Sequence, residues 1–329
     1  MIATERADAF LTDNGMHPDC VDFEKCKNAF VSDMTNGLEG KPSSLLMIPA
    51  FLSADGQAAE GETAIAVDIG GTNLRIALTR FYKGAIEILD ADESPVPGLQ
   101  NEITKEAFFY EIAERLLPVV HESSRIGVCF SHAAEILPNR DGRLISFSKE
   151  IRVTGAEGME IARELSQTLF RMGIRDKKNY VLLNDTTAVL LSGAAASAGE
   201  ACDGCIGFVL GTGMNLCYTE KTPEIKKLKD GYDGDTMIIN TESGYFTRVP
   251  GGVIDLELDS LTANPGTHLL EKSTSGRYLG QLILLTLDAY PQASLKARLV
   301  AIDAQVDAGG RALLVRGRLE STDTKLRTG

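Results

Sequence analysis

The sequence predicts an α/β fold with two lobes around a central cleft. Short apolar strands alternate with amphipathic helices along most of the 329 residues, a length that suits two domains. Two segments each consist of an apolar strand, a glycine turn and a second strand, namely AIAVDIGGTNLRIALTR at 64–80 and IGFVLGTGMNLCYTE at 206–220. Their turns form a weak internal repeat, D-x-G-G-T-N against L-G-T-G-M-N, so we expect one glycine turn in each lobe.

The individual elements follow from hydrophobic periodicity and from capping residues. Residues 1–60 are expected to be mostly helical and 62–90 to form successive strands, with further strands at 125–130 and 180–183 and helices at 104–120, 155–172 and 187–198. Thr104 suits the N-cap of its helix. Residues 292–329 contain no aromatic residue, Cys or Met, and are interpreted as a helix with a polar tail or as a chain that ends early or is read out of frame.

Three regions are expected along the chain. Residues 1–60 form a helical region that packs on the large lobe, 61–183 form the small lobe with the first glycine turn, and 184–329 form the large lobe with the second. The formal net charge of −13 argues against nucleic acid and anionic membranes as partners. No run of 18 apolar residues is present, the first ten residues carry charges where a signal peptide needs an apolar core, and six cysteines are too sparse for a disulfide framework. A cytoplasmic protein is therefore expected, with no indication of its oligomeric state.

The glycine turns are candidate phosphate sites. Backbone N–H groups that point outward together bind anions, here the phosphates of a nucleotide. The residues concerned are Gly70, Gly71, Thr72 and Asn73 in the first turn and Gly211, Thr212 and Gly213 in the second. Asp68, at the end of the first strand, is placed to hold Mg²⁺, directly or through water. Two such hairpins facing each other across a cleft are typical of the actin-like ATPase (ribonuclease H-like) fold, so ATP and Mg²⁺ are the expected cofactors. The alternative is that the two segments are unrelated hairpin turns.

Several polar residues in short segments form a second candidate site. Carboxylates accept hydrogen bonds, whereas Asn and Ser both donate and accept, and a mixture of these side chains suits a ligand with many hydroxyl groups. Singly, each residue is more often a loop residue or a helix cap. Together with the phosphate turns they predict a kinase that acts on a polyol. The residues are Ser131, Ser148, Lys149, Asn184, Asp185, Asn215, Glu242 and Glu271.

In these segments the chain resembles the hexokinases, of bacterial-like type, up to about Tyr290. The matching blocks are Phe130-Ser131, the segment 142–149, Leu183-Asn184-Asp185-Thr186, 239–244 and 264–280, in the order that the family has. The resemblance implies that Asp185 is the general base for the sugar 6-hydroxyl and that Lys149 supplies positive charge near the transferred phosphoryl group. It implies that all eight polar residues named above, Lys149 included, hold the sugar, which we expect to be glucose, with mannose and fructose as alternatives. It also implies that Arg75 supports the first turn or touches the phosphoryl group.

Some positions depart from the family pattern. His132 and Ala133 stand where the family usually has an aromatic residue and a proline, and His268 stands where many members have glutamine. After about residue 290 neither an adenosine-holding segment nor a final helix is found, so we expect a truncated or frame-shifted hexokinase with weak nucleotide binding. Two other classes stay open: a non-catalytic sugar-binding protein, and a nucleotide-switch ATPase that binds no sugar.

Overall fold

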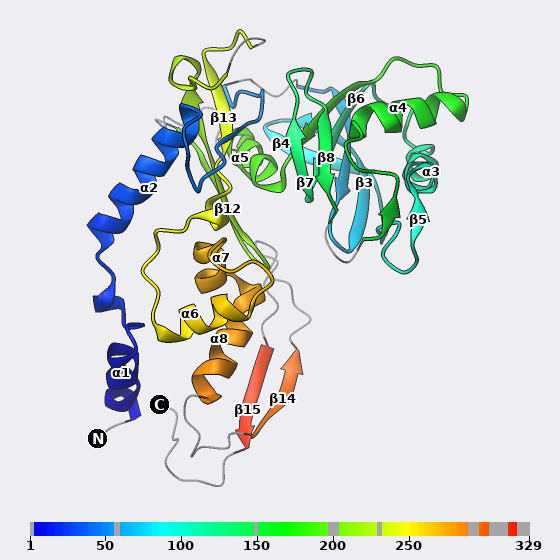
Figure 1. Ribbon diagram of the computed structural model, residues 1–329. Helices are drawn as coiled ribbons and strands as arrows, with labels where there is room; N and C mark the ends of the chain where they lie inside the picture. The colour runs from blue at the N-terminus through cyan, green and yellow to red at the C-terminus, as the bar shows by residue number, and fades with distance from the viewer. Residues whose placement is uncertain are drawn as a thin grey trace.

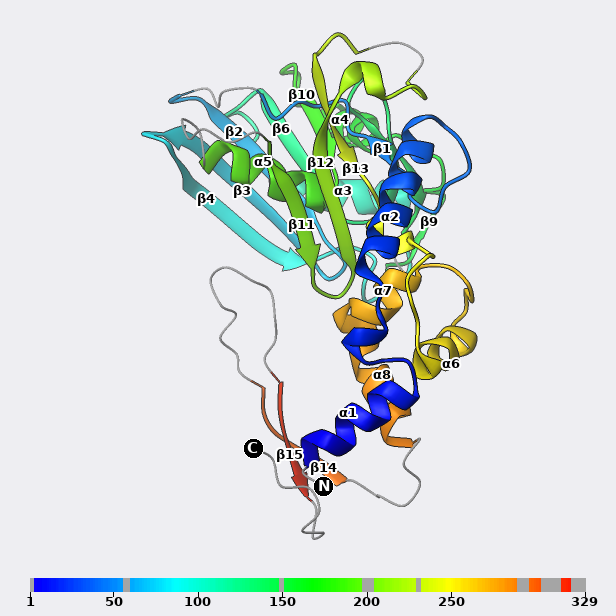
Figure 2. The same cartoon turned by 90° about the vertical axis from the view of Figure 1, so that its left-hand side faces the viewer.

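Two β-sheets, each with helices packed against it, form the framework of the molecule (Figure 1). The computed structural model describes residues 3–55, 60–147, 151–196, 204–228, 232–288, 296–302 and 315–320. Within these residues one sheet has five strands in the order β10-β6-β2-β3-β4, and another has four in the order β1-β13-β12-β11. The two sheets lie in separate lobes (Figure 1), and the view turned by 90° shows the helices between residues 253 and 288 below both sheets (Figure 2).

The five-stranded sheet contains the first glycine turn. Strands β2 (Thr63–Ile69), β3 (Asn73–Tyr82) and β4 (Ala85–Pro95) are antiparallel, while β6 (Arg125–Phe130) and β10 (Asn179–Leu183) run parallel to β2. Alternate residues of β2 are buried because side chains in a strand point to opposite faces. This buried face packs with α3 (Lys105–Leu116) and α4 (Ile161–Arg171) in one core. Since β2, β6 and β10 are parallel, the residues that follow them meet at one edge of the sheet.

The four-stranded sheet contains the second glycine turn. Strands β11 (Ile206–Leu210), β12 (Met214–Lys221), β13 (Thr236–Asn240) and the short β1 (Ile48–Pro49) pair antiparallel. Helix α5 (Asp185–Ala196) covers one face, where Ile238 packs in a cluster with Leu190. Helix α2 (Phe23–Leu38) covers the other, where Ile239 packs in a cluster with Leu38. A Cβ atom on Gly207 would lie 2.7 Å from the carbonyl oxygen of Thr186, so only glycine allows α5 to approach β11 this closely.

A group of helices lies below the second sheet (Figure 1). It consists of α6 (Val253–Leu261), α7 (Leu269–Thr274) and α8 (Gly276–Asp288), with Ile254, Leu258 and Leu282 in a shared apolar cluster. Lys272 on α7 is buried and donates to Asp259 on α6 at 2.6 Å. Helix α1 (Ala3–Asp13) precedes a loop whose Asn14 carbonyl accepts the Val253 amide at the start of α6. Three two-stranded sheets complete the described chain: β5 (Ile103–Thr104) with β9 (Val153–Thr154), β7 (Ala133–Ile136) with β8 (Gly142–Ser146), and β14 (Lys296–Ile302) with β15 (Val315–Glu320).

Most predicted elements are confirmed, and two are corrected. Thr104 caps α3 by accepting the Ala107 amide at 3.3 Å. Helix α4 begins at Ile161 instead of Gly155, because Gly155 and Gly158 have φ of 71° and 70° and turn the chain before the helix starts. Residues 296–302 and 315–320 pair as strands, so the helix expected after residue 292 is wrong for these segments. In the described part of the chain, no helix is both long and apolar enough to cross a membrane.

Candidate active site

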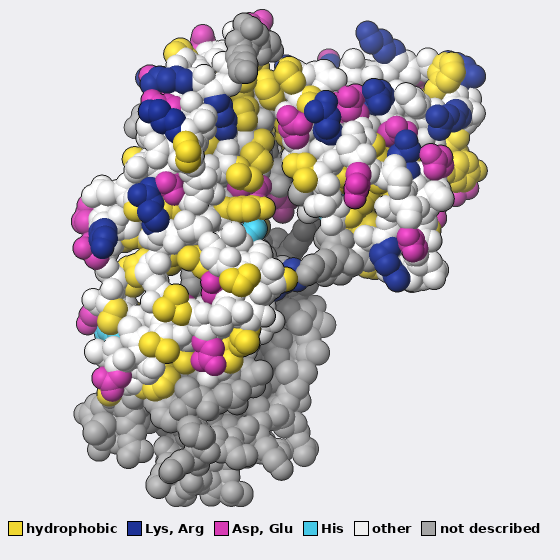
Figure 3. Space-filling model, viewed as in Figure 1, with side chains coloured by type: hydrophobic (Ala, Val, Ile, Leu, Met, Phe, Trp, Pro, Cys, Tyr) yellow, Lys and Arg dark blue, Asp and Glu magenta, His cyan; other side chains and the backbone are white. Residues whose placement is uncertain are grey.

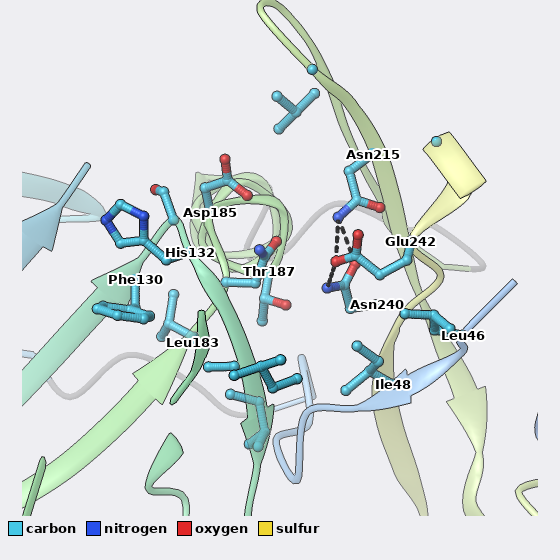
Figure 4. A pocket seen from close by; sticks show the side chains of 18 of the residues that line it. Leu46, Ile48, Phe130, His132, Leu183, Asp185, Thr187, Asn215, Asn240 and Glu242 are labelled. Atoms are coloured by element: carbon cyan, nitrogen blue, oxygen red, sulfur yellow. Dashed lines mark hydrogen bonds between the residues drawn. The ribbon is translucent and has the colours of Figure 1, made fainter. Parts of the chain in front are cut away.

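The cleft between the two lobes has a volume of about 590 Å³ and collects most of the predicted polar residues. Figure 3 shows acidic side chains beside the hollow between the lobes, and Figure 4 shows the lining from close by. The cleft is lined by side chains that follow β6 and β10, by the start of β12, and by the loops around β13 and α7. Among the predicted residues it contains Ser131, Asn184, Asp185, Gly213, Asn215, Glu242 and Glu271.

Asp185 and Asn184 form one wall of the cleft. They follow β10 directly, and Asp185 is the first residue of α5. The Thr186 amide donates to Asp185 Oδ1 at 2.8 Å and to Asn184 Oδ1 at 2.9 Å. These bonds satisfy an N-terminal amide of α5 and fix both side chains at the cleft. Ser131, which is exposed, follows the neighbouring strand β6, and its amide donates to the Ile69 carbonyl at 3.1 Å.

Asn215, Asn240 and Glu242 form a hydrogen-bonded network on the opposite wall (Figure 4). Asn240 Nδ2 donates to Glu242 Oε1 at 2.8 Å, and Asn215 Nδ2 donates to Asn240 Oδ1 at 2.8 Å and to Glu242 Oε1 at 3.2 Å. Burial raises the pKa of Glu242, the charges of Asp185 and Glu271 raise it further, and the two asparagine amides oppose the rise. Glu242 is therefore an acceptor held in position by donors, in a cleft where acidic side chains repel each other.

Glu271 and His268 close the cleft from the side of α7. Glu271 Oε2 accepts the Met214 amide at 3.2 Å, which ties α7 to the residue after the second glycine turn. A Cβ atom on Gly213 would lie 3.0 Å from the same oxygen, so a larger residue there would displace the carboxylate. The His268 ring lies 3.7 Å from the Tyr245 ring, centroid to centroid, and burial lowers the pKa of His268.

The first glycine turn is held by its own backbone and by charged neighbours. The Gly70 amide donates to the Asn73 carbonyl at 3.0 Å, while Gly71 and Thr72 are exposed. Arg75 donates to Asp68 Oδ2 at 3.2 Å and to Glu93 Oε1 at 3.2 Å. Among the described residues no cluster of three or more His, Cys, Asp or Glu could hold a metal ion. A single carboxylate such as Asp68 nevertheless fits Mg²⁺ that is held mainly by phosphate oxygens.

The second glycine turn is anchored to the start of α8. The amides of Gly276 and Arg277 donate to the carbonyls of Gly211 and Thr212 at 2.8 and 3.2 Å. The Gly211 amide donates to the Gly213 carbonyl at 2.9 Å, and Thr212 is the exposed residue of this turn. Gly213 alone of this turn lines the cleft, and no residue of the first turn does.

Two of the predicted residues, Ser148 and Lys149, lie outside the described residues. Sequence reasoning missed Asn240, Tyr245 and the buried Thr187 as residues of the cleft. Asn240 stands in the segment Asn-Thr-Glu at 240–242 that carried part of the resemblance, and this was the available signal. Thr187 and Tyr245 directly follow the matching blocks that end at Thr186 and Gly244, and this adjacency was the available signal for them.

Comparison with known proteins identifies the family. Two family models, both described as hexokinase, match residues 13–195 and 205–309, so the match extends beyond Tyr290. Hexokinase-1 of Schizosaccharomyces pombe is 31% identical over 280 residues, with 81% of this chain and 57% of that protein covered. Hexokinase-like 1 protein of Arabidopsis thaliana is 33% identical over 274 residues, with 78% and 54% covered. The chain thus spans about half the length of these curated relatives.

Solved structures show the same fold. A hexokinase from Schistosoma mansoni, complexed with glucose, superimposes with a TM-score of 0.67 at 24% identity over 87% of this chain and 66% of that one. A second hexokinase crystal structure gives a TM-score of 0.65 at 22% identity, with 90% and 66% covered. The predicted two-lobed actin-like ATPase fold is confirmed, and the chain belongs to the hexokinase family.

Proposed function

We propose that the protein is an ATP-dependent hexokinase that phosphorylates the 6-hydroxyl of a hexose. The observation that carries this proposal is the convergence of Asn184, Asp185, Asn215, Glu242 and Glu271 on one cleft, from segments up to 87 positions apart (271 − 184). These side chains offer both donors and acceptors, which a polyol needs. Family membership supports the same reaction class.

In the proposed reaction Asp185 removes the proton from the sugar 6-hydroxyl. The sugar oxygen then attacks the γ-phosphorus of ATP, a new oxygen–phosphorus bond forms, and the bond to ADP breaks. Asp185 suits this role because Thr186 fixes its carboxylate at the cleft. Most of the rate enhancement in phosphoryl transfer comes from positioning and from stabilising charge, so the base is one contributor among several. Lys149 is proposed to add positive charge at the phosphoryl group.

The sugar is proposed to lie between the two walls. Glu242, Asn215 and Glu271 would hold hydroxyl groups from one side, and Asn184, Ser131 and Ser148 from the other. Glucose is the proposed substrate, because the S. mansoni relative was crystallised with it; mannose and fructose are the alternatives. Closure of the two lobes over the sugar would exclude water, which competes as a phosphoryl acceptor.

ATP is proposed to contact the two glycine turns, with Mg²⁺ near Asp68. The exposed Gly71 provides a backbone N–H group for phosphate oxygens in the first turn, whereas the Gly211 N–H of the second turn already donates to the Gly213 carbonyl. Mg²⁺ supplies charge neutralisation of the phosphates when it is bound. Thr72, Asn73, Thr212 and Gly213 would complete the contacts, and Arg75 would stiffen the first turn through its ion pairs. Cytoplasm is the proposed location, on the acidic charge and sparse cysteines.

The test is glucose-dependent release of ADP from MgATP. The wild-type protein should turn over, and Asp185→Ala should abolish turnover while glucose still raises the melting temperature. Asp235→Ala is the matched control, since Asp235 is exposed and lies outside the cleft. Turnover that survives Asp185→Ala would show that another group is the base. A glucose-induced rise in melting temperature without any turnover would instead support the alternative of a non-catalytic sugar-binding protein.

A further inference from the structure

We infer that His132 is a positioning residue that orients the Gly71 amide of the first glycine turn, an inference that rests on the proposed function for its kinetic consequence. His132 follows the predicted sugar ligand Ser131 by one position, and its ring nitrogen Nε2 lies 3.1 Å from the carbonyl oxygen of Gly70. The contact joins residues 62 positions apart. It connects the segment predicted to bind sugar with the turn predicted to bind phosphate.

The hydrogen bond assigns the tautomer of the imidazole. A carbonyl oxygen only accepts hydrogen bonds, so Nε2 must carry the hydrogen and donate it to Gly70. The ring is held in place by packing: it is 7% exposed and lies edge-on to Phe130 and Phe147, with centroids 5.0 and 5.3 Å away. Figure 4 shows it beside Phe130 at the wall of the cleft. A donor on so confined a ring has a fixed direction.

The direction of the Gly70 carbonyl determines that of the next amide. In a trans peptide the C=O of one residue and the N–H of the next point to opposite sides. When His132 holds the Gly70 oxygen toward the sugar segment, the Gly71 N–H points away from it. Gly70 and Gly71 both lack a Cβ, so without this bond the peptide between them can rotate at little steric cost. His132 thus selects one of two orientations for a predicted phosphate donor.

Three variants separate this role from simple packing. His132→Phe keeps an aromatic ring but removes the donor, and His132→Gln keeps a donor without the ring. His121→Phe is the control, because His121 is an exposed histidine whose partner is the exposed Asp176. For His132→Phe the KM for MgATP should rise about two- to tenfold, the effect of one lost neutral hydrogen bond, with the glucose KM changed by less than twofold. His132→Gln should restore the nucleotide KM to within about twofold of wild type.

A second measurement tests the geometry without any turnover. Nitrogen-15 NMR of labelled histidine should show His132 with its proton on Nε2, and the Gly71 amide resonance should move in His132→Phe but not in His121→Phe. If the wild type shows no kinase activity, the proposed function fails while this measurement still decides the inference. A proton on Nδ1, an unmoved Gly71 resonance, or an equal rise of both KM values in His132→Phe would each overturn it.

Discussion

Replacing Asn240 with alanine should weaken sugar binding, although Asn240 is not itself a predicted sugar ligand. Asn240 is 6% exposed at the end of β13, and its amide nitrogen donates to Glu242 Oε1 at 2.8 Å. Its side-chain oxygen accepts from Asn215 at 2.8 Å. One truncation therefore removes the central member of a network that positions two predicted sugar ligands, without removing either ligand.

The magnitude follows from the charge of the acceptor. A hydrogen bond to a carboxylate contributes about 1.5–3 kcal/mol, so the glucose KM of Asn240→Ala should rise roughly tenfold to a hundredfold. The Asn240 amide also opposes the rise in the pKa of Glu242. In the variant that pKa is higher still, so Glu242 becomes protonated at a higher pH as the pH falls. The loss of glucose affinity should accordingly be greater at pH 6 than at pH 8.

The assay is the glucose KM at saturating MgATP across this pH range, with glucose-induced thermal shifts as a binding measurement. Asn101→Ala is the matched control, since Asn101 is exposed and does not line the cleft. The glucose KM of this control should stay within twofold of wild type at every pH tested. An unchanged glucose KM in Asn240→Ala, or a defect that grows as the pH rises, would refute the reasoning.

Three further changes test other parts of the structure. Glu242→Gln should raise the melting temperature relative to wild type, and by more at pH 8 than at pH 5. The pKa of Glu242 is higher in the folded than in the unfolded state, so the folded state binds more protons and wild-type stability falls as the pH rises above the ordinary value of 4.5. A larger rise at pH 5 than at pH 8 would contradict this. Gly207→Ala should lower the melting temperature because the new Cβ would lie 2.7–2.8 Å from three neighbouring atoms, and it should lower kcat because two of these atoms belong to α5, which begins with Asp185. Gly193→Ala, on the open surface of the same helix, should instead stabilise the protein by about 0.5–1 kcal/mol. Lys272→Met should destabilise by roughly 3–5 kcal/mol in denaturant titrations, since it leaves Asp259 without its buried partner, and adding Asp259→Leu should recover part of that loss.

The sequence predicted the wall of the cleft that contains Asn184 and Asp185 better than the opposite wall around Asn240. The first wall follows a parallel strand, whereas the second depends on the register of antiparallel strands. Asn184 and Asp185 come directly after a recognisable strand, and ligands in α/β folds gather beyond such strand ends. The network around Asn240 instead requires that Cys217 pairs with Asn240, which brings Asn215 within reach. A strand pattern fixes which face a side chain occupies, but it contains no information on which residue of another strand lies opposite.

The contact between His132 and Gly70 was beyond prediction for a related reason. It exists because β6 lies beside β2 with Phe130 opposite Ile69, and strand order is set by the packing of the whole lobe. The early start expected for α4 failed on local grounds, since amphipathic spacing continues through residues that Gly155 and Gly158 turn away from helix. Periodicity identifies a helix more reliably than it identifies the first residue of that helix.

The two glycine turns share one structural property that bears on how a kinase of this fold couples its substrates. The His132 ring donates to Gly70 of the first turn, and the amide of its neighbour Ser131 donates to Ile69, the residue just before that turn. Just after the second turn, the Met214 amide donates to the carboxylate of Glu271. Each candidate phosphate site is therefore one hydrogen bond away from a candidate sugar ligand or its neighbour. Because these bonds are made by the protein itself, a sugar that orders Ser131 and Glu271 would also order both turns, and nucleotide binding should strengthen when sugar is present.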